Sequence, residues 1–129
     1  MLRQLLCACA LLPSLAAPAL GAEGEGTRGE ELFRKNCKTC HSLTDDGVRR
    51  AGPHLAGVIG RQVGILDGFA YSEALKDATF AWDADRLDGW LTNPQAFLPG
   101  TYMLYRQADP GIRRDIIDYL QAAVGGAGN

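Results

Sequence analysis

The chain has 129 residues, of which 47% are hydrophobic, 22% charged and 8% aromatic, and its formal net charge is −2. This balance excludes a disordered chain, a collagen-like repeat and a strongly basic nucleic-acid-binding protein. The length predicts one folded domain. Side chains that could bind a metal ion are few, with four Cys, two Met and two His, so each can be considered individually.

Residues 1–22 have the composition of a secretory signal peptide. Arg3 supplies a positive charge, an uncharged apolar run follows over 5–12, and small residues lie at the expected cleavage point near Gly21 or Ala22. A membrane span needs about 18 or more apolar residues, and prolines interrupt this run. We expect an exported, periplasmic protein without stable membrane insertion after cleavage; the alternative is an uncleaved N-terminal anchor.

Cleavage would leave very few metal-binding side chains. It would remove two cysteines, the first methionine and one arginine, so 12 Lys and Arg would face 15 Asp and Glu, a net charge of −3. The candidates that remain are Cys37, Cys40, His41, His54 and Met103.

The first half of the mature region predicts one helix followed by irregular chain. Residues 23–28 are polar and Gly-rich and predict a flexible tail, with a helix from Thr27 into Cys37. Closely spaced glycines over 42–68 predict a long structured loop, and a short helix follows over 72–76. A loop of this length in a compact domain needs another structure at its centre around which it can wrap.

In the second half, Asp83 predicts the cap of a helix that presents Leu87, Trp90 and Leu91 on one face and ends at Pro94.

A loop is expected over 93–101. The last helix has the clearest start, with Asp109 as N-cap and Pro110 in the first turn. Residues 125–129 predict a flexible tail, so the folded domain should span 29–124. No alternating strand pattern is present, and the fold class expected is all-α with large loops.

The run Cys37-Lys38-Thr39-Cys40-His41 has the Cys-x-x-Cys-His spacing of covalent haem attachment. Residues three apart lie on one side of a helical turn, so both thiols can reach the two vinyl groups of one porphyrin, and the histidine can face the iron. Three alternatives compete: a thioredoxin-like redox pair, a simple disulfide, and a zinc site completed by His54.

A sixth iron ligand follows by elimination. Met103 is the single methionine of the mature chain and lies in a constrained segment rich in proline and glycine. A methionine sulfur on haem iron raises the reduction potential. His54 is the rival, and its position directly after Pro53 favours a place in the loop instead.

An ordered series of motifs now points to one family. The motifs are Gly29-x-x-x-Phe33, Cys37-x-x-Cys40-His41, Gly52-Pro53-x-Leu55, Gly60-Arg61, Gly68-Phe69-x-Tyr71-Ser72, Trp82, Leu91-x-Asn93-Pro94, Pro99-Gly100-Thr101-x-Met103 and Asp115-Ile116-Ile117-x-Tyr119-Leu120. Over about residues 29–123 the chain resembles the class I monohaem cytochromes c, in particular the mitochondrial and bacterial c2-type branch.

The resemblance implies a cytochrome c fold, in which the N- and C-terminal helices pack together and loops wrap one covalently bound haem c. Cys37 and Cys40 match the attachment cysteines, and His41 and Met103 match the two iron ligands. Pro53 matches the proline whose carbonyl holds the other ring nitrogen of the histidine.

Further matches concern the helix contact and the haem propionates. Gly29, Phe33, Ile116 and Tyr119 match residues of the contact between the terminal helices. The residues that match groups beside the propionates are Arg61, Tyr71, Trp82 and Thr101. Without the resemblance, Arg61 would be a solvated charge and Trp82 an ordinary core residue.

Three positions depart from the family pattern. Trp90 stands where a Tyr commonly lies beside the methionine sulfur, and Leu75 where an Asn often orders a water. We expect these changes to remove polar groups from the side of the haem on which Met103 lies. The reduction potential should then be no lower than usual, or raised, because low polarity disfavours the more positive ferric iron. His54 replaces the usual Asn, and no role is predicted for it.

The sequence therefore predicts a monomeric one-electron carrier that is not an enzyme. The alternative is a haem-based ligand-binding or sensor protein with a labile sixth ligand. Expected partners are redox proteins: a bc1-type complex, a terminal oxidase, a photosynthetic reaction centre or a periplasmic dehydrogenase. Gln95 and Ala96 stand where the family often has two lysines, so docking should depend weakly on salt.

Overall fold

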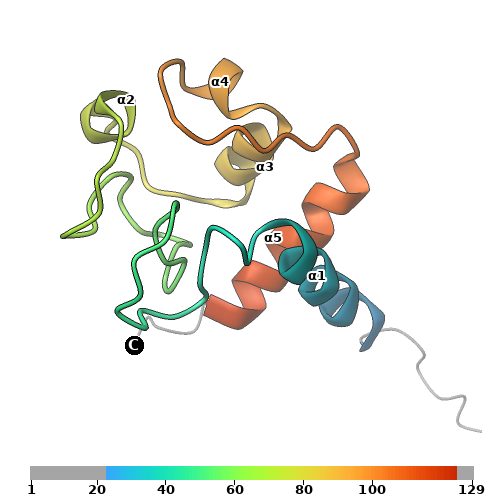
Figure 1. The fold of residues 1–129 in the computed structure, drawn as a ribbon. Coiled ribbons are helices and arrows are strands. Elements are labelled where there is room, and N and C mark those ends of the chain that lie inside the picture. Colours follow the sequence, from blue (N-terminus) through green and yellow to red (C-terminus); the bar gives the residue numbers. More distant parts are fainter. Residues whose placement is uncertain (1–22, 125–129) are drawn as a thin grey trace, which may run out of the picture.

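The structure, a computed structural model, describes residues 23–124, which form five helices joined by long irregular segments (Figure 1). The helices are α1 (Glu23–Asn36), α2 (Glu73–Asp77), α3 (Ala84–Thr92), α4 (Pro94–Phe97) and α5 (Pro110–Val124). Within this range the β-type pairing is limited to one isolated antiparallel bridge, Gln62–Ala81. The all-α prediction is confirmed, whereas the predicted signal peptide 1–22 and tail 125–129 lie outside the described residues.

Three helices begin at capping side chains, and two of these caps, Asp83 and Asp109, are the ones that the sequence predicts. Ser72 caps α2, and Asp83 caps α3 by accepting a hydrogen bond from the Arg86 amide at 2.8 Å. The Asp109 carboxylate accepts from the Gly111 amide at 2.7 Å at the start of α5. Each side chain satisfies an amide that has no partner inside its helix.

The structure differs from the prediction at two places. α1 begins at Glu23 rather than Thr27, so the expected tail 23–28 lies within the helix. Each glycine costs a helix about 1 kcal/mol relative to alanine, which weakens the first turn without ending it. The predicted loop after Asn93 contains α4, because Asn93 caps a single turn and Pro94 suits its first position.

The terminal helices α1 and α5 pack directly on one another. At Gly29 a Cβ atom would lie 2.3 Å from the backbone oxygen of Asp115, so only a glycine permits this separation. Beside it, the rings of Phe33 and Tyr119 lie 5.8 Å apart, and Ile116 is almost fully buried. The predicted contact of the two helices is confirmed.

The remaining segments surround the centre of the molecule. In Figure 1, α3, α4 and the chain that follows them lie on one side, and the segment after α1 lies on the other. Main-chain bonds tie the loop around residue 61 to the strand-like segment before α3: the Gly60 amide donates to the Trp82 oxygen at 2.7 Å, and the Trp82 amide to the Arg61 oxygen at 2.9 Å. Within residues 23–124, no helix has the length and apolar character needed to cross a membrane.

Candidate haem site

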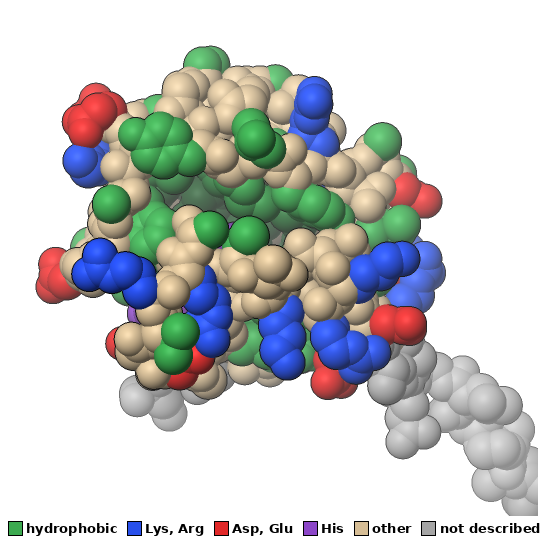
Figure 2. All heavy atoms as spheres, in the orientation of Figure 1, with side chains coloured by type: hydrophobic (Ala, Val, Ile, Leu, Met, Phe, Trp, Pro, Cys, Tyr) green, Lys and Arg blue, Asp and Glu red, His purple; other side chains and the backbone are tan. Residues whose placement is uncertain are grey.

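A cavity of about 430 Å³ lies between the two sides and opens to the surface, where Figure 2 shows a hollow lined with hydrophobic side chains. Eight of the nine predicted site residues line it: Cys37, Cys40, His41, Pro53, Arg61, Tyr71, Trp82 and Met103. The ninth, Thr101, is not among the lining residues. Its side chain is buried, and its hydroxyl has no hydrogen-bond partner within the described part of the chain.

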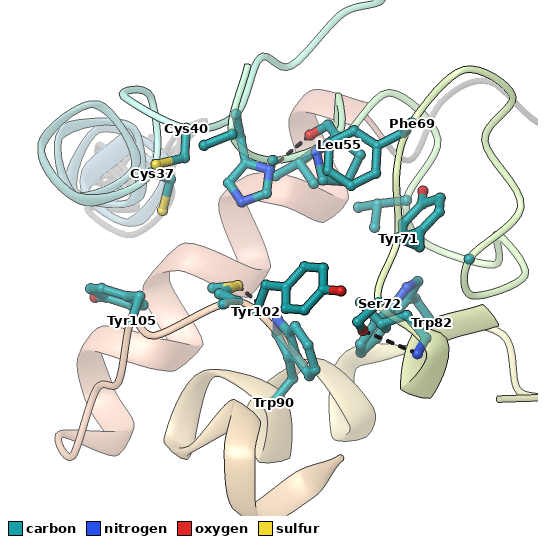
Figure 3. A pocket seen from close by; sticks show the side chains of 18 of the residues that line it. Cys37, Cys40, Leu55, Phe69, Tyr71, Ser72, Trp82, Trp90, Tyr102 and Tyr105 are labelled. Atoms are coloured by element: carbon teal, nitrogen blue, oxygen red, sulfur yellow. Dashed lines mark hydrogen bonds between the residues drawn. The ribbon is translucent and has the colours of Figure 1, made fainter. Parts of the chain in front are cut away.

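The end of α1 positions the two cysteines. The amides of Cys37 and His41 donate to the oxygens of Phe33 and Cys37 at 2.8 and 2.9 Å, so the backbone turns tightly through the motif. In Figure 3, Cys37 and Cys40 lie on the opposite side of the cavity from Trp90. Burial, and to a smaller extent the neighbouring Cys40, raises the pKa of the Cys37 thiol to about 11. This thiol is therefore protonated at neutral pH rather than poised as a nucleophile.

The alternatives to haem attachment find no support in this geometry. Both cysteines are free rather than joined in a disulfide. In the described part of the chain, no three His, Cys, Asp or Glu side chains are grouped so that they could hold a metal ion, which removes the zinc site. The strand that a thioredoxin-like motif needs in front of the cysteines is replaced by α1.

His41 is oriented by the main chain of the following loop. Its Nδ1 lies 2.7 Å from the Pro53 oxygen, which can accept a hydrogen bond from Nδ1–H. The pKa of His41 is lowered, chiefly by burial and also by Arg61, against a raising effect of the Pro53 bond. The ring is thus neutral at pH 7 with its proton on Nδ1, which leaves the Nε2 lone pair free to bind a metal.

Gly52 allows this arrangement because of its size. A Cβ atom there would lie 2.3 Å from Cε1 and 2.7 Å from Nε2 of His41. The loop backbone therefore passes against the imidazole ring and holds its orientation.

Met103 lines the cavity from the segment after α4. Its sulfur accepts a hydrogen bond from the Trp90 indole, with Nε1 and Sδ 3.1 Å apart. The expectation that Trp90 removes a polar group from this side is therefore wrong, since the indole N–H retains a donor at the sulfur. Leu75 also lines the cavity and supplies no polar group, as expected.

Arg61 brings a half-buried positive charge to the cavity. Its guanidinium donates to the oxygens of Ala56 and His54 at 2.8 and 3.1 Å, and no carboxylate of the described residues pairs with it. Burial lowers the pKa of Arg61, opposed by Tyr71. A half-buried cation without a counter-ion favours an acidic group in the cavity.

The two aromatic candidates, Tyr71 and Trp82, are buried residues that also line the cavity. Burial raises the pKa of Tyr71, so its hydroxyl is a neutral hydrogen-bond donor. Trp82 belongs to the core and packs edge-on against Phe80 and Trp90, with ring centroids 5.0 and 5.3 Å apart. It also lines the cavity, and its role beside a propionate stays a prediction.

His54 lies away from the lining of the cavity. Its Nε2 is 3.9 Å from an Asp45 oxygen, while its buried Nδ1 has no hydrogen-bond partner within the described residues. The structure thus places Met103 at the cavity and leaves the rival ligand outside it.

Sequence reasoning missed the role of Gln95, which does not line the cavity but contacts the segment that carries Met103. The Gln95 side-chain amide donates to the Thr101 oxygen at 2.5 Å and to the Met103 oxygen at 3.4 Å. No sequence pattern indicates these bonds, because an exposed glutamine in the single-turn helix α4 has no periodic or motif-based requirement.

Comparison with known proteins agrees with the motifs. Residues 26–123 match the family model described as Cytochrome c. A Rhodobacter capsulatus protein named cytochrome c-type cyt cy is 43% identical over 98 residues, which cover 75% of this chain and 48% of that protein. The cytochromes c of Guizotia abyssinica and Chlamydomonas reinhardtii are 35% and 39% identical, over 91% and 90% of their lengths and 78% of this chain. The chain thus spans about half of the Rhodobacter protein and most of the other two.

Proposed function

The chain belongs to the cytochrome c family, whose members carry electrons on one covalently bound c-type haem, and we propose that it does so outside the cytoplasm with Cys37, Cys40, His41 and Met103 holding the haem. The observation that carries this proposal is one cavity lined by a pair of cysteines, a neutral histidine and a methionine sulfur.

The residues of the cavity fit such a group. Apolar walls suit a porphyrin, and the unpaired Arg61 charge suits its propionates. When bound, the haem supplies an iron that changes by one unit of charge. His41 would present Nε2 to that iron while Pro53 holds Nδ1–H, and Met103 would present its sulfur as the second ligand. With both ligands held in place by the protein, the surroundings of the iron would change little between its two charge states.

We propose a carrier and not an enzyme, because His41 and Met103 together would leave the iron no open position for a substrate. The sensor alternative needs an open or labile position. The test uses the purified haem-containing protein: we expect one added haem by mass, a sharp α-band, and no rapid carbon monoxide binding to the ferrous form at neutral pH. Rapid binding by the unmodified protein would establish the sensor alternative.

A pair of variants separates the two candidate ligands. We expect Met103→Ala to bind carbon monoxide rapidly, because the sixth position opens. His54→Ala should behave as the unmodified protein, since His54 does not line the cavity. The opposite result would reassign the ligand to His54.

The proposed partners are membrane or periplasmic redox proteins of the bc1, oxidase, reaction-centre or dehydrogenase type. Tyr102 and Leu104 flank Met103 in sequence, line the mouth of the cavity and are 74% and 77% exposed. They form an apolar contact surface at the mouth of the cavity that would hold the haem. A protein partner with an apolar centre at its own redox site would fit this surface.

We also propose cleavage near Gly21 or Ala22, a domain over 29–124 and a periplasmic location. These assignments depend on the composition of residues 1–22 and on attachment of c-type haem outside the cytoplasm. N-terminal sequencing of the protein recovered from the periplasm tests them. A chain that retains its first residues in the membrane fraction would establish the anchored alternative.

A further inference from the structure

The segment that carries Met103 has little support from the main chain. Among the described residues, the amides of residues 102–106 make no hydrogen bond to another backbone group. The neighbouring anchors lie at its ends, where the Thr101 amide donates to the Leu98 oxygen at 3.3 Å and the Gln107 amide to the Leu91 oxygen at 2.8 Å. Side chains must therefore hold the centre of this segment.

Gln95 supplies one of these contacts. It lies in the single-turn helix α4, and its one amide nitrogen reaches the oxygens of both Thr101 and Met103, at 2.5 and 3.4 Å. The two oxygens bracket Tyr102, so a single side chain fixes the backbone on both sides of that residue. α4 is in turn closed by the Leu98 amide, which donates to the Pro94 oxygen at 2.9 Å.

Trp90 supplies the other contact, at the sulfur itself. The indole is 7% exposed and packs edge-on against Trp82 and Phe97, so its N–H has a fixed direction. A thioether sulfur has two lone pairs, and the indole engages one of them. The second remains for a metal, which makes the hydrogen bond compatible with ligation.

We propose that Gln95 is a positioning residue for Met103 and limits how fast Met103 leaves the iron. Its effect is separable from that of Trp90, the residue that stands where the family commonly has a tyrosine beside the sulfur and that raises the reduction potential. The inference rests on the proposed ligation by Met103. Gln95 acts on the backbone and leaves the sulfur untouched, so its loss should change exchange and spare the potential. The Trp90 N–H withdraws electron density from the sulfur, which disfavours the more positive state of the metal.

The exchange experiment uses the ferric haem-containing protein and imidazole as the displacing ligand. Gln95→Glu keeps the size of the side chain but places a carboxylate against two carbonyl oxygens. We expect imidazole uptake to accelerate about tenfold, the equivalent of one lost hydrogen bond of about 1.4 kcal/mol. Gln121→Glu is the matched control, because Gln121 is exposed on α5, far in sequence from the segment. Equal rates in the two variants would overturn the role of Gln95.

The potential experiment compares Trp90→Phe with Leu91→Val. Both remove volume from buried positions of α3, but only the first removes a donor to the sulfur, and Leu91 does not line the cavity. We expect a negative shift of the potential in Trp90→Phe alone, and Gln95→Glu to keep the original value. An unchanged potential in Trp90→Phe would overturn the role of Trp90. If Trp90→Phe fails to fold, Trp90→Tyr replaces it, because tyrosine can return an O–H donor to the sulfur. The potential of Trp90→Tyr should stay close to that of the unmodified protein. A large negative shift in Trp90→Tyr would overturn the role of Trp90.

The absorption band of methionine-ligated ferric haem separates this inference from the proposed function. Its presence in the unmodified protein, together with unaltered exchange in Gln95→Glu, would contradict only the inference. Its absence from the unmodified protein would contradict the ligation itself and the inference with it.

Discussion

The two faces of the cavity hold their candidate iron ligands by different means. On the His41 face, the contacts come from the main chain. The Pro53 oxygen lies at Nδ1, and two amides of the loop donate to the chain on either side of His41: Gly52 to the Cys40 oxygen at 2.9 Å and Leu55 to the Ser42 oxygen at 2.8 Å. On the Met103 face, the contacts come from side chains, Trp90 and Gln95. One ligand is therefore held by the fold, and the other by replaceable residues.

This difference has a consequence for how the protein can vary. A main-chain hydrogen bond survives most substitutions, so the His41 face should tolerate side-chain changes until a residue obstructs the backbone itself. The Met103 face should respond gradually, because each side chain contributes a separate interaction of about 1 kcal/mol.

Gly52→Ala should produce the largest loss on the His41 face. The new Cβ would lie 2.3 to 2.7 Å from three atoms of the imidazole ring, so either the loop or the ring must move. We expect the free energy of unfolding of the haem-containing protein to fall by about 2 to 3 kcal/mol, the range for overpacking at a rigid site. Guanidinium unfolding followed by visible absorption measures it.

Gly57→Ala is the matched control for this prediction. Gly57 has a φ of +64° and nothing within 4 Å of the added Cβ, so the substitution tests backbone strain without a clash. A loss of about 1 kcal/mol is expected there. If Gly52→Ala costs no more than Gly57→Ala, the close approach of loop and ring does not constrain His41.

The helix starts could be predicted from sequence because capping is local. Asp83 and Asp109 each satisfy amides within three residues, and their helices begin where expected. The same local rules missed α4, because a single turn has no apolar periodicity to indicate it. They also placed the start of α1 too late, since Gly-rich composition outweighed the continuing helix in that prediction.

Arg113→Met should produce the next largest effect, because Arg113 binds the backbone just after the segment that carries Met103. Arg113 is buried in α5; its Nε donates to Asp88 of α3 at 2.7 Å, and its Nη1 to the oxygens of Gln107 and Ala108 at 3.0 Å each. Methionine keeps the apolar stem but leaves these acceptors unpaired. We expect the free energy of unfolding to fall by about 2 kcal/mol.

Arg86→Met is the control, because Arg86 forms an exposed pair with Asp83. Exposed pairs contribute about 0 to 1 kcal/mol. Similar losses in the two variants would show that α5 does not support the Met103 side through Arg113.

The candidate ligands could be predicted because covalent attachment imposes a fixed local spacing on Cys37, Cys40 and His41. Met103 followed from scarcity, since one methionine remained. The resemblance placed Trp90 beside the methionine sulfur, but neither its hydrogen bond to the sulfur nor the contacts of Gln95 could be predicted. Gln95 and Trp90 reach Met103 across eight and thirteen residues of sequence, and only the packing of α3 and α4 brings them there.

Thr101→Val should have a smaller effect that tests the predicted propionate contact. The hydroxyl of Thr101 is buried and has no partner among the described residues. If it donates to a haem propionate, replacement by the isosteric valine should lower the free energy of unfolding of the haem-containing protein by about 1 kcal/mol. Thr92→Val is the control, because the Thr92 hydroxyl donates to the Asp88 oxygen at an exposed position. If Thr101→Val leaves the free energy of unfolding unchanged or raises it, the Thr101 hydroxyl does not bind a propionate.

The smallest effect is expected at the mouth of the cavity, where the two faces meet solvent. Several cations away from the cavity lining are paired with carboxylates, including Arg50 with Asp46 at 2.7 Å and Lys76 with Glu73 at 2.8 Å. The Arg50 guanidinium holds the pKa of Asp46 at about 2, so that pair stays charged on both sides at neutral pH. With their charge balanced locally, these residues contribute little to long-range steering.

Tyr102→Lys should therefore change the salt dependence of association more than the stability. Tyr102 is exposed beside Met103, and a lysine there would add one unpaired positive charge at the apolar contact surface. We expect the bimolecular rate of reduction by an acidic redox partner to rise by a few-fold at low ionic strength, and to converge with the unmodified rate near 1 M salt, where the screening length is about 3 Å. A matched Tyr102→Gln variant should show the shallow slope of the unmodified protein. A steep slope in the unmodified protein itself would show that charge, rather than the apolar rim of the Met103 face, guides its partner.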